Sequence, residues 1–130
     1  YVNLRAAQFL KRRPNALRLV SCHLGNGSSL CAVDHGRSVD TTMGFTPTSG
    51  IPMGTRSGDL DPGALVFLMR SEGLTVDQVD GLVNRRSGLL GVSGVSPDMR
   101  DLLACRGANE HAAEAVKAFQ EKRKPVFTGR

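Results

Sequence analysis

The feature that most limits how this chain can fold is a Gly-Asn-Gly sequence between two short stretches of strand-forming residues. Leu17, Leu19 and Val20 lead into it, and a second stretch over residues 28–34 follows at once. Glycine has no Cβ, so such a loop lets backbone N–H groups approach an anion closely. The same residues are typical of an ordinary hairpin turn, in which Gly and Asn supply positive φ. The sequence predicts two paired strands joined by either a plain turn or a phosphate-binding loop.

The rest of the pattern predicts an α/β order. A helix is expected over residues 3–13 and ends at Pro14-Asn15, and three strands follow at about 17–23, 28–34 and 37–42, with His35-Gly36 as a turn. Residues 43–57 are rich in glycine and proline and show no periodicity, which is typical of a site rather than a core. No P-loop motif and no G-x-G-x-x-G helix start is present.

Helices are predicted for the second half of the chain. Asp61-Pro62 starts one that Gly73 ends, and Thr75 with Gln78 forms a capping box for another that runs to about Arg85. After a glycine loop at 88–94, Ser96-Pro97-Asp98 starts a further helix, with Ser96 as its cap and Pro97 at its first position, and Asn109 is expected to cap the last one.

Composition limits the function classes. The net charge of +5 comes from basic clusters expected at helix ends, and no nucleic-acid recognition motif accompanies them, so nucleic acid is not expected as a partner. No apolar run is long enough to span a membrane. The three cysteines have no metal-ligand spacing, and Cys22 and Cys31 are expected to be buried in strands, which suits a reducing, cytoplasmic setting.

Longer strings of residues carry a family resemblance. They run in one order along about residues 1–120 and resemble the acetate kinase (acetate/propionate kinase) family. The strings cover residues 23–29, 38–47, 53–62, 87–94 and 98–101. The resemblance implies a ribonuclease-H-like α/β domain of the acetate and sugar kinase, Hsp70 and actin superfamily, here incomplete. Its expected parts are a junction helix (1–14), strands and active-site loops (15–60), helices (61–124) and a truncated strand (125–130).

The resemblance implies a role in phosphoryl transfer for several residues. The loop His23, Leu24, Gly25, Asn26 and Gly27 is expected to contact the ATP phosphates, with the amides of Gly25 and Gly27 as donors. A strand-end histidine bonded to a backbone carbonyl is the alternative for His23. Asp98, Met99 and Arg100 match a segment that contacts the nucleotide, although Asp98 is also a favourable first-turn acid.

Arg56 is the expected catalytic residue. It lies in a Gly-Thr-Arg-Ser-Gly turn, and in the family the matching arginine stabilises the transition state. The alternative is a surface arginine paired with Asp59 or Asp61. Neither aspartate is expected to be a base, since Asp61 precedes a proline and suits an N-cap.

The function implied is ATP- and Mg²⁺-dependent phosphorylation of a short-chain carboxylate, acetate first, by an enzyme that forms a homodimer. The family's catalytic aspartate, its substrate-binding arginine, its first histidine stabiliser and its magnesium-binding glutamate lie in segments outside this chain, so no metal ligand is expected here. The run 124–130 resembles a family strand, but it begins earlier in this sequence than in the family and ends before the loop that follows that strand. A catalytically incomplete nucleotide-binding fragment or interaction module is therefore the alternative.

Overall fold

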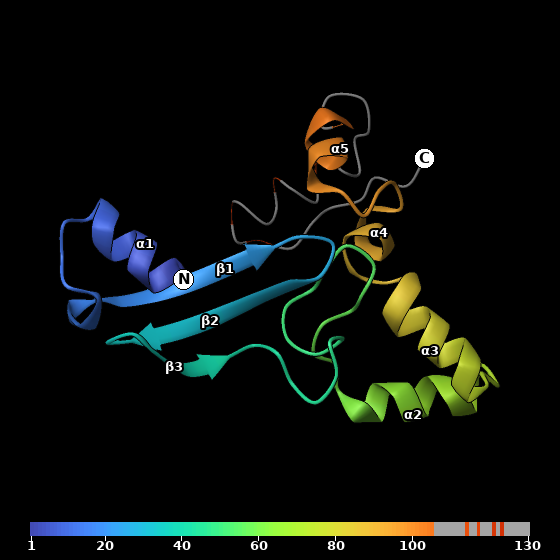
Figure 1. The fold of residues 1–130 in the computed structure, drawn as a ribbon. Coiled ribbons are helices and arrows are strands. Elements are labelled where there is room, and N and C mark those ends of the chain that lie inside the picture. The colour runs from blue at the N-terminus through green and yellow to red at the C-terminus, as the bar shows by residue number, and fades with distance from the viewer. Residues whose placement is uncertain (106–113, 115–116, 118–120, 122, 124–130) are drawn as a thin grey trace.

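Three antiparallel strands form the centre of the molecule (Figure 1). The computed structural model describes residues 1–105, 114, 117, 121 and 123. Helix α1 (Val2–Phe9) and a 3₁₀ turn, η1 (Pro14–Ala16), precede strands β1 (Arg18–Leu24), β2 (Ser28–Asp34) and β3 (Arg37–Thr41), which lie in the order β1-β2-β3. The predicted strands are confirmed to within one residue at each end, whereas the first helix ends at Phe9, four residues before the predicted end.

The two connections within the sheet use different backbone conformations. His35 and Gly36 both have positive φ, at 51° and 85°, as expected for a tight turn whose twist matches the strands. The loop 25–27 closes the β1–β2 hairpin between the paired residues Leu24 and Ser28, yet none of its residues has a left-handed φ. The hairpin is confirmed, but the positive φ expected in this loop is wrong, so its glycines serve a purpose other than turn geometry.

Within the described residues, four helices follow the long loop 42–61 (Figure 1). They are α2 (Pro62–Ser71), α3 (Val76–Arg85), α4 (Gly88–Ser93) and α5 (Met99–Ala104). The Asp61 carboxylate caps α2 by accepting from the Gly63 N–H, and the Thr75–Gln78 capping box starts α3, both as predicted. Arg85 lies in the last turn of α3, where its charge suits the helix dipole.

Two helix predictions are corrected. Residues 88–94 were expected to form a loop but contain α4, because the N–H groups of Leu89 and Leu90 bond to distant carbonyls that stabilise its first turn. Helix α5 has Asp98 as its N-cap, where Ser96 was expected, since the Asp98 carboxylate accepts from the Arg100 N–H. The predicted Asn109 cap and the strand at 125–130 lie outside the described residues.

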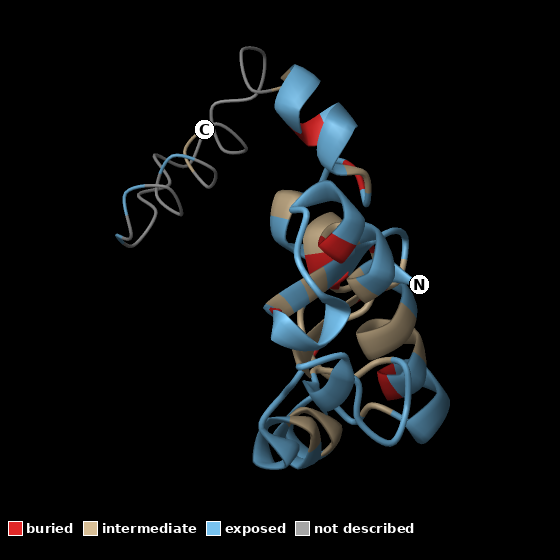
Figure 2. Cartoon of the chain, turned by 60° about the vertical axis from the view of Figure 1, so that its left-hand side comes forward, coloured by how far each residue is buried: buried red, intermediate tan, exposed pale blue. Residues whose placement is uncertain are grey.

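The core of the described part is small (Figure 2). Its buried apolar side chains are Ala7, Leu17, Met53, Val79 and Leu102. Cys22 is exposed and Cys31 half-buried, so the expectation that both are buried is wrong. The reason is the alternation of β1, in which Leu19 and Ser21 are half-buried whereas Arg18, Val20 and Cys22 face solvent.

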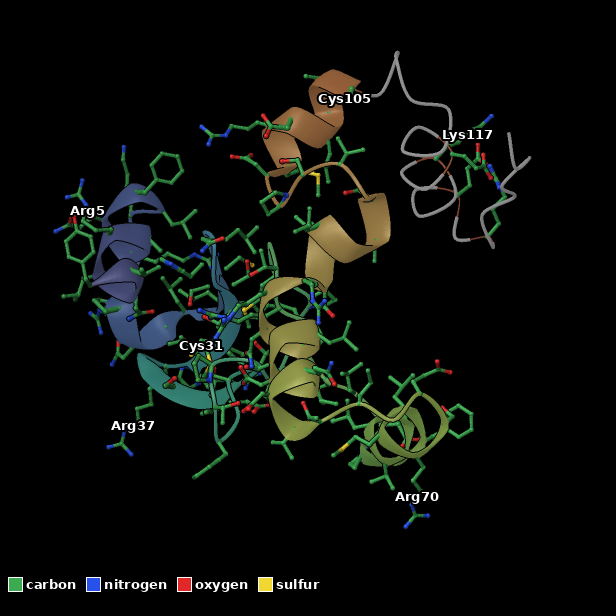
Figure 3. All side chains as sticks on the ribbon, turned by 90° about the vertical axis from the view of Figure 1, so that its right-hand side faces the viewer. Arg5, Cys31, Arg37, Arg70, Cys105 and Lys117 are labelled. Carbon is green, nitrogen blue, oxygen red and sulfur yellow. The ribbon has the colours of Figure 1, made fainter. Side chains whose placement is uncertain are left out.

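The surface of the described part carries basic side chains as well as exposed apolar ones such as Phe9 and Phe45. The side chains of Arg5, Arg37 and Arg70 extend outward from three different elements (Figure 3). No helix in this part of the chain has the length and hydropathy required to cross a bilayer.

Candidate functional site

The loop 23–27 is held at the tip of the β1–β2 hairpin. Within it, the Gly25 N–H donates to the Gly27 carbonyl at 3.1 Å, and the buried Ser28 hydroxyl donates to the Gly25 carbonyl at 3.2 Å. The Gly25 amide is therefore engaged within the loop, and its donation to a phosphate stays a prediction. The side chains of His23 and Leu24 are exposed at the loop's entry.

Arg56 lies against this loop. Its Nη1 donates to the Pro47 carbonyl at 3.2 Å and to the Met53 Sδ at 3.7 Å. A Cβ atom on Gly27 would lie 3.2 Å from the same Nη1, so the guanidinium occupies the space that the missing side chain leaves. Glycine at position 27 thus allows close approach, which explains its presence without a positive φ.

The alternative in which Arg56 pairs with a neighbouring aspartate is wrong. Asp59 accepts from the Ser49 hydroxyl and the Gly50 N–H at 3.0 and 2.7 Å, and Asp61 caps α2. Among the described residues, Arg56 forms no ion pair. Its positive charge therefore has no carboxylate partner in this part of the chain.

The turn that carries Arg56 is fixed by the ends of two helices. The Met53 N–H donates to the Arg56 carbonyl at 3.0 Å and closes the turn. The N–H groups of Leu89 and Leu90, in the first turn of α4, donate to the carbonyls of Met53 and Gly54 at 2.8 and 3.0 Å. These bonds use helix N–H groups that have no partner within the helix, so α4 serves as a support for the turn.

Further bonds join the same turn to the end of α3. The Ser57 N–H donates to the Val83 carbonyl at 2.9 Å, and the Ser87 N–H donates to the Thr55 carbonyl at 3.0 Å. Gly88 has a φ of 62°, and a Cβ there would overlap the carbonyl of Met53. The turn therefore packs directly on the backbone at the start of α4.

Gly54 joins the hairpin loop to the segment before α5. Its N–H donates to the Asn26 carbonyl at 3.3 Å, and a Cβ on it would lie 3.0 Å from Asn26 Oδ1 and 3.1 Å from the Pro97 carbonyl. The structure thus brings three segments together around Gly54: the loop 23–27, the Arg56 turn and the residues that lead into α5.

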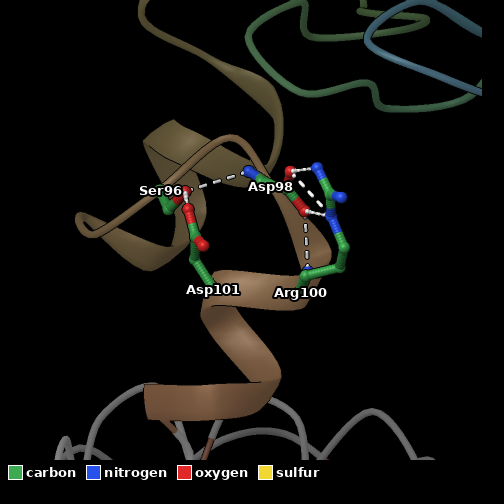
Figure 4. Close-up of polar contacts among 4 residues, drawn as sticks. All are labelled: Ser96, Asp98, Arg100 and Asp101. Carbon is green, nitrogen blue, oxygen red and sulfur yellow. Dashed lines mark hydrogen bonds and ion pairs between the residues drawn. The ribbon is translucent and has the colours of Figure 1, made fainter.

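The start of α5 carries a compact set of polar contacts (Figure 4). Arg100 Nη2 lies 2.5 Å from Asp98 Oδ2, and the Arg100 N–H donates to Asp98 Oδ1 at 2.8 Å. Hydrogen bonds from the Arg100 side chain, and then from its backbone, lower the pKa of Asp98 to about 2. The Ser96 hydroxyl donates to Asp101 at 2.7 Å and accepts from the Asp98 N–H. Asp98 and Arg100 thus neutralise each other here, and Met99 is exposed.

Two residues that support the site were not predicted. Gly88 was read as part of a loop, and Asn84 was not singled out, although its backbone carbonyl accepts from the Thr55 hydroxyl at 3.0 Å. Asn84 lies 29 residues from Thr55 along the chain, so no local pattern marks the contact. The Ser-Gly pair at residues 87–88, within a matched string, was the available signal for Gly88.

Comparison with known proteins gives the family. The Acetokinase family matches residues 1–128. The acetate kinase of Caldicellulosiruptor saccharolyticus is 52% identical over 120 residues, which are 92% of this chain and 30% of that protein. The propionate kinase of Yersinia enterocolitica is 50% identical over 128 residues, which are 98% of this chain and 31% of that protein.

Solved structures agree with this match. Porphyromonas gingivalis acetate kinase superposes with a TM-score of 0.83 at 43% identity, over 93% of this chain and 31% of that one. A propionate kinase from Francisella tularensis gives a TM-score of 0.80 at 38% identity, over 92% of this chain and 30% of that one. The expected ribonuclease-H-like α/β fold class is confirmed, and the chain spans about a third of the length of these relatives. With residues 1–128 matched and the fold shared, this chain belongs to the Acetokinase family.

Proposed function

We propose that this chain forms the phosphate-binding part of an ATP-dependent kinase that phosphorylates a short-chain carboxylate, acetate first, to an acyl phosphate. The observation that carries the proposal is that the Arg56 guanidinium lies beside Gly27, at the tip of the β1–β2 hairpin, in the space that a side chain there would take. The names of the relatives, acetate kinase and propionate kinase, support this choice of substrate class.

The residues present fit a phosphate group. Arg56 is half-buried, and its Nη1 is oriented by Pro47 and Met53, so the cation is held in place before a ligand arrives. A planar guanidinium donates two parallel hydrogen bonds to phosphate oxygens, and these charge-assisted bonds are among the strongest in proteins. Gly27 carries no side chain that would compete with the guanidinium for the space beside it. This combination of a fixed cation and open backbone suits an anion with several oxygens.

Arg56 is proposed to neutralise charge on the transferred phosphoryl group. In phosphoryl transfer the protein acts mainly by positioning groups and by stabilising charge on the phosphoryl oxygens. In the complete enzyme, loss of Arg56 is expected to lower the rate on the order of 10³-fold or more. A lysine there offers one point charge in place of the planar fork, so Arg56→Lys is not expected to restore full activity.

The remaining predicted contacts complete the nucleotide site. His23, Leu24 and Asn26 are proposed to contact the phosphates beside the glycines of the loop, and Asp98, Met99 and Arg100 to contact the nucleotide. The packing of Gly54 against both Asn26 and Pro97 supports one continuous site. Either the Asp98–Arg100 ion pair stays intact beside the nucleotide or Arg100 exchanges its carboxylate partner for the ligand.

Magnesium has no evident ligand set in the part of the chain that the structure describes. No three His, Cys, Asp or Glu side chains gather there in a way that would hold a metal ion. Mg²⁺ is proposed to accompany ATP in the complete enzyme, and no step is assigned to a metal held by this chain. On the same family grounds we propose that the complete enzyme forms a homodimer in the cytoplasm. We also propose that this chain divides into a junction helix, active-site loops and a helical part.

The test is an acyl-phosphate assay on the purified chain. ATP, Mg²⁺ and acetate are incubated with it and the product is trapped with hydroxylamine, beside an ATP titration and an Arg56→Ala control. Binding of ATP that Arg56→Ala weakens, without turnover, is expected, because the family's catalytic aspartate lies in a segment outside this chain. Turnover that vanishes in the control would show that the chain, or an assembly of it, completes an active site.

Absence of both turnover and ATP binding would contradict the proposal. It would favour the second candidate function, an interaction module that keeps the family fold without its chemistry. The observation that favours this candidate is that the Gly25 N–H already donates to the Gly27 carbonyl and that Arg100 is paired with Asp98.

A further inference from the structure

Asn84, near the end of α3, accepts hydrogen bonds from two threonines that are next in sequence to Pro47 and Arg56. Its side-chain Oδ1 accepts from the Thr48 hydroxyl, and its backbone carbonyl accepts from the Thr55 hydroxyl at 3.0 Å. Thr48 follows Pro47, whose carbonyl accepts from Arg56 Nη1, and Thr55 precedes Arg56 itself. One residue thus restrains both the Pro47 carbonyl, which accepts from the guanidinium, and the backbone next to Arg56.

The side chain at position 84 must offer both a donor and an acceptor. Its Nδ2 donates to Asp80 Oδ1 at 2.8 Å, one helical turn earlier on α3. An ionised carboxylate only accepts, so Asp80 requires the amide nitrogen of Asn84 to face it. The amide oxygen is then left to face Thr48. Asp80 therefore sets the orientation that makes Asn84 an acceptor for the loop.

This contact connects parts of the chain that are distant in sequence. The loop 43–61 passes between the sheet and helices α3 and α4 (Figure 1). Thr48 and Asn84 are separated by 36 residues, and Thr48, Thr55 and Asn84 are all half-buried. Hydrogen bonds that are shielded from water and join such segments hold a loop in one position more firmly than exposed ones.

We propose that Asn84 is a positioning residue for Arg56, oriented by Asp80 and acting through Thr48 and Thr55. The inference rests on the proposed function in that it assigns Arg56 to phosphate binding. Asn84 itself touches neither the guanidinium nor the phosphate. Its effect is to keep Nη1 in place against Gly27 before a ligand arrives.

The decisive experiment exchanges the two side chains. Asn84→Asp keeps an acceptor for Thr48 but removes the donor to Asp80 and places two carboxylates side by side. The double variant Asn84→Asp with Asp80→Asn restores one amide and one carboxylate with their positions reversed. Its amide donates to residue 84, whose carboxylate still accepts from Thr48. The exchange removes the exposed ion pair between Asp80 and Arg85, whose atoms lie 3.7 Å apart. An exposed pair of this kind contributes little to the stability of the fold.

The principal readout is the Nε–Hε NMR signal of Arg56 in the nucleotide-free chain, assigned by its loss in Arg56→Lys. We expect Asn84→Asp to shift or broaden this signal and the double variant to restore it. ATP affinity should fall about tenfold in the single variant, the size of one hydrogen bond to a charged group, and recover in the double variant.

The NMR signal is measured without ATP, so failure of the nucleotide proposal leaves this test intact. If Asn84→Asp does not fold, Thr48→Val takes its place, because it removes the hydroxyl donor and leaves α3 unchanged. An Arg56 signal that is unchanged in a folded Asn84→Asp or Thr48→Val chain would overturn the proposal. So would a folded double variant that fails to restore the signal.

Discussion

Arg56 Nη1 lies beside Gly27, although strands β2 and β3 and a long loop separate these two residues in the sequence. A Cβ atom at residue 27 would lie 3.2 Å from Arg56 Nη1, closer than ordinary packing allows. Because φ at this glycine is not left-handed, a side chain here would disturb the nearby guanidinium and would not strain the backbone. Because the two are so close, a change in the loop 23–27 is expected to move the Arg56 guanidinium as well.

Gly27→Ala is expected to displace the Arg56 guanidinium with little loss of stability. The displaced group is the far end of a flexible side chain, so the unfolding free energy should change by less than about 1 kcal/mol. ATP affinity should fall several-fold, as measured by titration calorimetry. Gly25→Ala is the matched control for the Arg56 NMR signal, because a Cβ there meets only ordinary contacts at 3.4 and 3.5 Å. Identical Arg56 signals in both variants would contradict this prediction.

Gly88→Ala is expected to be strongly destabilising. Its φ of 62° is left-handed, and the added Cβ would overlap the Met53 carbonyl below the Arg56 turn. Gly94 is the matched control, since its φ is 64° and nothing lies within 4 Å of the same Cβ position. Gly94→Ala should cost about 1 to 2 kcal/mol from backbone strain alone. Urea unfolding of both variants gives the difference, and equal losses would show that the turn tolerates the contact.

Gly81→Ala is expected to stabilise the chain. Gly81 lies inside α3 without a positive φ, and a Cβ there would meet only the Arg86 side chain at 3.7 Å. Replacing an interior helical glycine with alanine raises the unfolding free energy by up to about 1 kcal/mol. Thermal unfolding followed by circular dichroism checks this, and a lower melting temperature would be inconsistent with the helix as described.

Thr75→Ala is expected to destabilise α3. The Thr75 hydroxyl accepts from the Gln78 N–H at 3.3 Å, and Gln78 Oε1 accepts from the Thr75 N–H at 2.8 Å. Loss of the threonine half of such a box costs about 1 kcal/mol. Thr75→Ser keeps the acceptor and serves as the control. Equal unfolding midpoints for the two variants would exclude a capping contribution.

The Asp98–Arg100 pair predicts a defined acid dependence. Hydrogen bonds from Arg100 lower the pKa of Asp98 from 3.8 to about 2. Because the folded pKa lies below the unfolded one, the pair stabilises the fold above about pH 4 and loses this contribution as the pH falls to about 2. Carboxyl ¹³C NMR should show Asp98 titrating near 2 and returning towards 3.8 in Arg100→Gln. A midpoint near 3.8 in the unchanged chain would refute the ion pair in solution.

Local chemistry explains what the sequence could predict. The strands, the His35-Gly36 turn, the Asp61 cap and the Thr75–Gln78 box all depend on residues within a few positions of each other, and each was found. Helix α4 was missed because its glycines favour a loop, whereas its first turn is stabilised by carbonyls of residues 53 and 54. Tertiary contacts of this kind override local propensity.

Burial and side-chain partners were harder to predict for the same reason. Cys22 lies in a strand as expected, but which face of a sheet is covered depends on the elements packed over it. Arg56 was identified because it lies in a sequence motif, residues 53–62, that resembles the acetate kinase family. Its neighbours Pro47 and Gly27 and its support from Asn84 follow only from the three-dimensional structure. The contact of Gly54 with Pro97 was likewise not visible in the sequence.

Only residues 86 and 87 separate the end of α3 from the start of α4, and both helix ends hold the same turn. A residue inserted at this joint would move one anchor by about 1.5 Å or rotate it by about 100° relative to the other. The connection between α2 and α3 carries no such double constraint. Natural variation in length among relatives should therefore accumulate before Thr75 and be absent between Arg85 and Gly88. At this joint the two helix ends that hold one turn constrain the number of residues, in addition to the identity of Gly88.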